Sequence, residues 1–93
     1  MLLYIEIFTT MIEVKKTTYD AEGIEEPCYE VTDGFIKVRI AKMYHYIGND
    51  TLVVSEYLDG EFNGSEEIIG DFDTLTEDEA KNIARRYSAY LGK

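Results

Sequence analysis

The sequence predicts an α+β fold: an antiparallel β-sheet of four or five strands in a meander, with one C-terminal α-helix packed on one face. Three observations lead to this prediction. Short segments of alternating apolar and polar residues recur along most of the chain. Asp-Gly and Asn-Gly dipeptides, which are strong hairpin-turn signals, separate several of these segments. The last segment instead has its apolar residues at helical spacing. With 93 residues, the chain is expected to form a single domain, 1–93.

The N-terminal segment Leu2–Ile12 is dense in Leu, Ile, Tyr and Phe, which predicts a first strand. The pair Thr9-Thr10 breaks the alternation, which indicates a bulge, a bend or two separate strands. An alternative is that the native protein begins at Met11, with Ile12 and Val14 alternating with charged residues. Whether the first ten residues belong to the native protein is left open by the pattern.

The next segment, Tyr19–Pro27, contains a glycine, the only proline and four acidic residues, and predicts a loop. Cys28–Val31 is a short strand candidate, followed by a turn at Asp33-Gly34. The clearest strand is Phe35–Ile47, in which Ile36, Val38 and Ile40 alternate with basic residues. Residues 48–50 predict a second turn, and Thr51–Leu58 predicts the next strand.

Two further turn signals, Asp59-Gly60 and Asn63-Gly64, lie close together in the chain. We expect one to close the hairpin and the other to mark a loop or a bulge. Glu66–Phe72 predicts a final short strand around Ile68 and Ile69. Successive strands joined by tight turns favour an antiparallel meander.

Thr76 and Glu79 have the spacing of a capping box, which predicts a helix that begins after Thr76. Acidic residues fill the expected first turn and basic residues follow, an order that suits the helix dipole. Gly92 is the expected C-terminal stop. Apolar residues form a single stripe that must face the sheet: Ala80, Ile83, Ala84, Tyr87 and Leu91.

The composition limits the classes of partner. A net charge of −10 argues against direct binding to nucleic-acid phosphates or to an anionic membrane. It favours a basic protein partner, a cation or solubility alone. A single cysteine, Cys28, cannot form an internal disulfide, and the N-terminus lacks the basic region of a signal peptide. We therefore expect an intracellular, cytoplasmic protein.

The sequence offers no specific catalytic or metal motif, and we expect no enzyme activity, no cofactor and no metal. His45 is the only histidine and has no visible partner. Cys28 lies among acidic residues, which disfavour a thiolate, and is expected to be a small buried apolar residue. The segment 59–70 begins like a calcium loop but ends in Gly70 where a bidentate Glu belongs, so a β-turn explains it better. Lys37 and Arg39 are expected to pair with Glu56 or another acid on a neighbouring strand.

The strongest functional signal is the run Asp50–Glu79, which contains eleven carboxylates and no Lys or Arg. Like charges held on one ordered surface repel, so a fold that keeps them favours use by a cationic partner. Alternate carboxylates on a strand lie about 6–7 Å apart, close to the spacing of nucleic-acid phosphates. The residues expected to bind the partner are two aromatic anchors and six acids: Tyr57, Phe62, Asp59, Glu61, Glu66, Glu67, Asp71 and Asp73.

A sheet that leads through D-F-D-T-L-T-E-D-E-A, Asp71 to Ala80, into a terminal helix resembles many small phage-encoded proteins. Among these, the chain is similar in length, acidity and architecture to anti-CRISPR proteins. That resemblance implies an inhibitor that blocks or mimics nucleic acid on a basic, nucleic-acid-handling effector. It covers architecture and charge, not a diagnostic motif, so it assigns no residues.

A second interpretation comes from the tyrosine content rather than from the charge. The chain has eight tyrosines, which suit half-buried sheet faces and interfaces. The alternative function is therefore a structural or regulatory module that self-associates, as a homodimer for example, through a sheet edge or a tyrosine-rich face. In that case the acidity serves solubility only.

Overall fold

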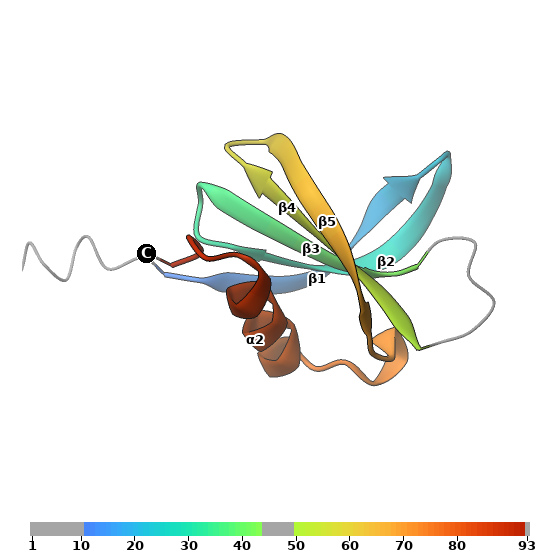
Figure 1. Cartoon of the computed structure of the whole chain (residues 1–93). Helices are drawn as coiled ribbons and strands as arrows, with labels where there is room; N and C mark the ends of the chain where they lie inside the picture. The colour runs from blue at the N-terminus through green and yellow to red at the C-terminus, as the bar shows by residue number, and fades with distance from the viewer. Residues whose placement is uncertain (1–10, 44–49, 93) are drawn as a thin grey trace, which may run out of the picture.

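The computed structural model describes residues 11–43 and 50–92. It confirms the α+β prediction: a five-stranded antiparallel meander in the order β1-β2-β3-β4-β5, with one helix against it (Figure 1). The elements are β1 (Glu13–Ala21), β2 (Ile24–Thr32), β3 (Ile36–Lys42), β4 (Thr51–Leu58), β5 (Glu61–Ile69), the short 3-10 helix η1 (Phe72–Thr74) and α2 (Glu77–Tyr87).

Helix α2 packs on β1, β2 and β3, and the core lies between this helix and the sheet. Directly opposed residues of neighbouring strands share a face. Val31 of β2 opposes Val38 of β3, and Ile40 of β3 opposes Val54 of β4; all four are buried in the core. The alternation predicted for β3 and β4 is therefore confirmed, and the other face of the sheet carries no helix within the described residues.

The predicted loop over Tyr19–Pro27 is wrong, because this segment forms the end of β1, a tight turn and the start of β2. Glu22 and Gly23 both have positive φ, 54° and 90°, as a two-residue hairpin turn requires. Pro27 is tolerated within β2 because it opposes Thr18 of β1, while the pairing of β2 with β3 starts one residue later, at Cys28.

The β4–β5 hairpin confirms that one Gly dipeptide closes the turn and the other marks a bulge. Asp59 and Gly60 have φ of 49° and 84° and form the turn. The register shifts between Ser55 and Tyr57, which places Asn63 and Gly64 opposite the single residue Glu56. The final strand is β5, Glu61–Ile69, rather than Glu66–Phe72. The segment that resembled a calcium loop is this turn and strand.

The C-terminal helix begins as predicted and ends earlier. Thr76 and Glu79 form the capping box: Thr76 N donates to the Glu79 carboxylate and Glu79 N donates to Thr76 Oγ1. The helix ends at Tyr87, so Gly92 is not its stop. Leu91 lies beyond the helix and is nevertheless buried in the core.

Other predicted boundaries fall partly outside the described residues. Of the strand predicted over Leu2–Ile12, only Met11 and Ile12 are described, and neither is in a strand. The strand predicted over Phe35–Ile47 is observed as β3. His45 and most of the turn at 48–50 are likewise not described.

Asp33 ties the β2–β3 turn to the C-terminal segment. Its carboxylate accepts hydrogen bonds from the backbone N–H groups of Phe35 and Ile36, at 2.9 and 2.8 Å, and from Gly92 N at 2.9 Å. Burial raises the pKa of Asp33, but these backbone donors lower it by more, so it lies below the usual value. The folded state therefore favours the charged carboxylate.

We expect Asp33→Ala to lower the free energy of unfolding at pH 7 by about 1 kcal/mol, because the backbone donors lose their acceptor. Since folding depresses the pKa of Asp33, its contribution is present above the unfolded value, about 3.9, and is lost as the pH falls through the folded value. Urea unfolding of the wild type and of Asp33→Ala at pH 7, 5 and 3 should show that their difference in free energy of unfolding becomes smallest at pH 3. Asp73→Ala, at an exposed position, is the control. If the difference in free energy of unfolding were the same at all three pH values, the charged Asp33 carboxylate would not be what stabilises this turn.

Candidate functional site

Carboxylates, all exposed except the half-buried Asp71, lie along edge strand β5, at η1 and in the first turn of α2. We call this set the acidic edge. None of its carboxylates makes an ion pair with Lys or Arg in the described parts of the chain. The described Lys and Arg residues therefore form no ion pair that neutralises the acidic edge. Its members are Glu61, Glu66, Glu67, Asp71, Asp73, Glu77, Asp78 and Glu79.

Members of the acidic edge differ in their roles. Glu66 opposes Val54 and lies on the helix side, whereas Glu67 opposes Val53 and lies on the other face. These two carboxylates therefore flank β5 rather than form a row on one face. Asp71 caps η1, where its Oδ1 accepts from Asp73 N at 3.0 Å. Glu79 belongs to the capping box of α2.

Two of the predicted acids lie where β5 begins, at the opposite end of the strand from Asp71. Asp59 lies in the β4–β5 turn and Glu61 starts β5, both exposed. The two predicted aromatic anchors do come together: the rings of Tyr57 and Phe62 meet edge to face, with centroids 5.7 Å apart. This pair lies on the helix-free face, because Tyr57 opposes Lys37 there.

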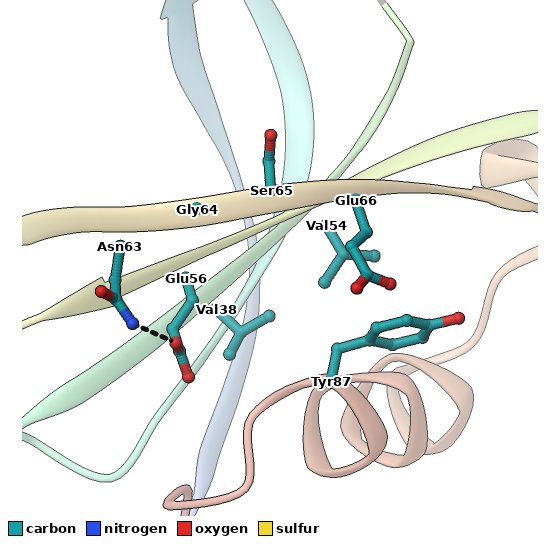
Figure 2. A pocket seen from close by; sticks show the side chains of 8 residues that line it. All are labelled: Val38, Val54, Glu56, Asn63, Gly64, Ser65, Glu66 and Tyr87. Atoms are coloured by element: carbon teal, nitrogen blue, oxygen red, sulfur yellow. Dashed lines mark hydrogen bonds between the residues drawn. The ribbon is translucent and has the colours of Figure 1, made fainter.

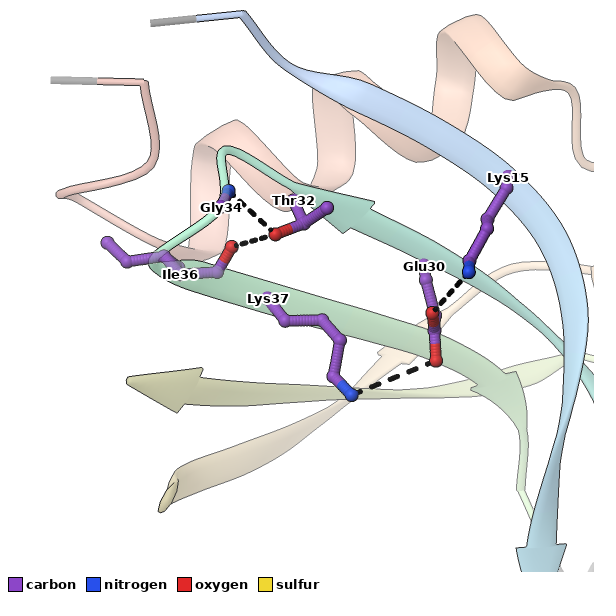
Figure 3. A network of polar contacts seen from close by, with 6 residues as sticks. All are labelled: Lys15, Glu30, Thr32, Gly34, Ile36 and Lys37. Carbon is purple, nitrogen blue, oxygen red and sulfur yellow. Dashed lines mark hydrogen bonds and ion pairs between the residues drawn. The ribbon is translucent and has the colours of Figure 1, made fainter. Parts of the chain in front are cut away.

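The basic row of the helix-free face is occupied within the protein. The Arg39 guanidinium lies over the rings of Tyr19 and Tyr57, at 4.2 and 5.4 Å from their centroids. Glu30 pairs with Lys37 at 3.8 Å and, from the other side, with Lys15 at 3.7 Å (Figure 3). The prediction that the basic residues pair across strands is confirmed for Lys37, but its partner is Glu30.

Glu56 cannot pair with Lys37, because it opposes Val38 and points to the helix side of the sheet. There it lies beside a pocket of about 200 Å³ between the β4–β5 hairpin and the C-terminal end of α2 (Figure 2). Asn63 Nδ2 donates to Glu56 Oε1 at 2.8 Å, and the Ser88 hydroxyl donates to Glu56 Oε2. The pocket is lined by Val38, Val54, Glu56, Asn63, Gly64, Ser65, Glu66 and Tyr87.

Sequence reasoning missed this pocket as a site. Glu66 was predicted to bind a partner, but Glu56, Asn63 and Tyr87 were not. The Asn63-Gly64 dipeptide did carry a signal, since a bulge re-aims the side chains beside it. In Figure 2, Asn63 and Glu66 both point to the helix side while Ser65 points away.

The single cysteine of the chain is buried in the described structure. Cys28 is fully buried, and burial, followed by the nearby Glu30 charge, raises the pKa of its thiol, which disfavours a nucleophile. Within residues 11–43 and 50–92, no three His, Cys, Asp or Glu side chains are placed to hold a metal ion. The same residues form no helix long and apolar enough to cross a membrane.

Comparison with known proteins gives no match, so functional inference for this chain depends on the acidic edge and the pocket. No protein-family model, no curated protein and no solved structure matches the chain.

Proposed function

We propose that the protein is a non-enzymatic acidic inhibitor that docks on a positively charged, nucleic-acid-handling protein, as anti-CRISPR proteins do. The observation that carries this proposal is the acidic edge: exposed carboxylates on ordered backbone, without cationic partners among the described residues. A basic groove that normally holds phosphates presents the complementary charge.

Keeping many negative charges close together has an energetic cost. Like charges on one ordered surface repel one another at longer range, although the acids in the first turn of α2 also interact favourably with the helix dipole. Part of this cost is offset inside the protein, because Asp71 and Glu79 cap helices. The side chains of Glu61, Glu67 and Asp73 make no hydrogen bond or ion pair with residues 11–43 or 50–92. Contact with a cationic partner would relieve their repulsion and speed association.

The test is displacement of a labelled oligonucleotide from purified nucleic-acid-binding effectors, CRISPR effector complexes among them, followed by fluorescence anisotropy. We expect the protein to displace the oligonucleotide from at least one effector. Glu67→Lys with Asp73→Lys should weaken displacement at least about tenfold at low salt, with the difference narrowing as salt rises.

The matched control is Glu13→Lys with Glu25→Lys, which changes net charge equally at two exposed positions on β1 and β2. It should retain most of the activity. Equal loss in both double variants would mean that only net charge matters. Failure of the wild type to displace the oligonucleotide from any effector would overturn the proposal. Circular dichroism should show both variants folded.

The helix-free face favours a second candidate function, self-association. Phe62 is 62% exposed and contacts Tyr57 on this face, so an aromatic surface remains open to a second copy. Sedimentation velocity on the same samples separates the two functions. A dimer that persists in the Glu67/Asp73 variant supports self-association, whereas a monomer with displacement activity supports the inhibitor.

A further inference from the structure

We propose that the pocket between the β4–β5 hairpin and α2 receives an arginine side chain of the partner protein. The inference rests on the proposed function, because it assumes a basic protein partner, and it names the contact that anchors that partner. Figure 2 shows the arrangement: β-sheet side chains on one wall, the Tyr87 ring on the other, and Glu56 and Glu66 on the sheet side.

The floor of the pocket suits the aliphatic part of an arginine. Val38 and Val54 are buried core residues that also line the pocket, so its base is apolar. Arginine packs its methylene stem on apolar surface while its guanidinium reaches polar groups. Helix α2 packs mainly on β1, β2 and β3, and the pocket lies between the end of this helix and the β4–β5 hairpin.

The polar groups of the pocket suit a guanidinium. Glu56 is half-buried and is oriented from two sides by neutral donors, Asn63 and Ser88, which hold the carboxylate in place without supplying a cation. Glu66 is exposed and adds a second carboxylate to the pocket. The bulge at Asn63-Gly64 brings Asn63 to this side of the sheet. A fixed carboxylate of this kind accepts hydrogen bonds from a guanidinium with little reorganisation.

The aromatic wall favours arginine over lysine. The ring of Tyr87 stands beside the Glu66 carboxylate, on the helix side of the pocket (Figure 2). A planar guanidinium can stack on an aromatic ring and still donate hydrogen bonds in its own plane, which a lysine ammonium cannot do. The pocket has a volume of about 200 Å³, which is enough for one long side chain but small for a larger ligand.

The test uses N-acetyl-arginine amide as the probe and two-dimensional NMR of the full chain. We expect saturable shifts at the backbone amide of Gly64 and the ring of Tyr87, with a Kd on the order of 1–10 mM. The citrulline analogue has nearly the same shape but no charge and should give no saturable shift. The lysine analogue should bind at least about threefold more weakly.

Glu66→Gln should weaken arginine binding at least about fivefold, because it removes one charge from an exposed side chain that makes no hydrogen bond or ion pair with the described residues. Glu25→Gln, at an exposed position on β2, is the control and should leave binding unchanged. Linear shifts that spread equally over all acidic residues, or equal binding of citrulline, would overturn the pocket assignment.

The two proposals fail separately. If arginine does not bind while the effector experiment succeeds, docking through the acidic edge stands and the arginine anchor falls. If arginine binds the pocket but no effector loses its oligonucleotide, the pocket stands as a guanidinium site and the inhibitor function falls.

Discussion

Ile40→Ala is expected to lower the free energy of unfolding by about 3–4 kcal/mol. Ile40 is 0% exposed on β3, the middle strand, where it opposes Tyr29 of β2 and Val54 of β4. Removing its side chain loses buried apolar area and leaves a cavity that strands on both sides hold open. A domain of this size has a stability of about 5–15 kcal/mol, so the loss is a large share of the total.

The matched control is the same substitution at Ile69, which is 91% exposed at the end of β5. Ile69→Ala should change stability by less than about 0.5 kcal/mol. Urea unfolding followed by circular dichroism measures both variants, with equal slopes showing that the unfolded states are comparable. If the two substitutions lower the free energy of unfolding by similar amounts, the core on the helix side of the sheet is not the main source of stability.

Phe72→Ala is expected to cost about 3 kcal/mol or more and to loosen the connection between β5 and α2. Phe72 is the buried residue of η1, 4% exposed, and its ring lies 5.5 Å from that of Tyr29. The Tyr29 hydroxyl also donates to the carbonyl of Leu75, just after η1, at 2.8 Å. Together these contacts hold the acidic η1 segment against the sheet.

Phe62→Ala is the control, since Phe62 is 62% exposed and its removal should cost less than about 1 kcal/mol. Hydrogen exchange at Leu75, whose N–H donates to Phe72 O, reports the local effect. We expect Phe72→Ala to raise exchange there more than global destabilisation alone explains. Unchanged exchange, after correction for global stability, would mean that Phe72 does not anchor η1.

The sequence was sufficient for elements whose local signals agree. Alternation in β3 and β4 and the capping box at Thr76 were all confirmed. The β1–β2 hairpin was missed because Gly23, Pro27 and several acids are usual in loops. Its turn is Glu-Gly rather than the usual Asn-Gly, and its proline lies in the part of β2 that pairs with β1 but not with β3.

The sequence predicted the negative charge of the candidate site but not the arrangement of its side chains. The sequence located the acidic run, and its carboxylates are mostly exposed. Neighbouring residues of a strand point to opposite faces, but the sequence could not tell that Glu66 rather than Glu67 lies on the helix side, because that depends on the register of β5 beyond the bulge. Nor could it place Tyr87 near Glu56, since contacts between a helix and a sheet depend on tertiary packing.

The position of β5 separates the residues that hold the fold together from those assigned to the partner in the proposed function. Of its nine residues, only Ile68 packs against the core. Most outward positions of β5 can therefore change without disturbing the core between β1–β4 and α2. If the proposed function holds, substitutions along this one strand would change the target, while the residues that stabilise the fold lie on the other elements.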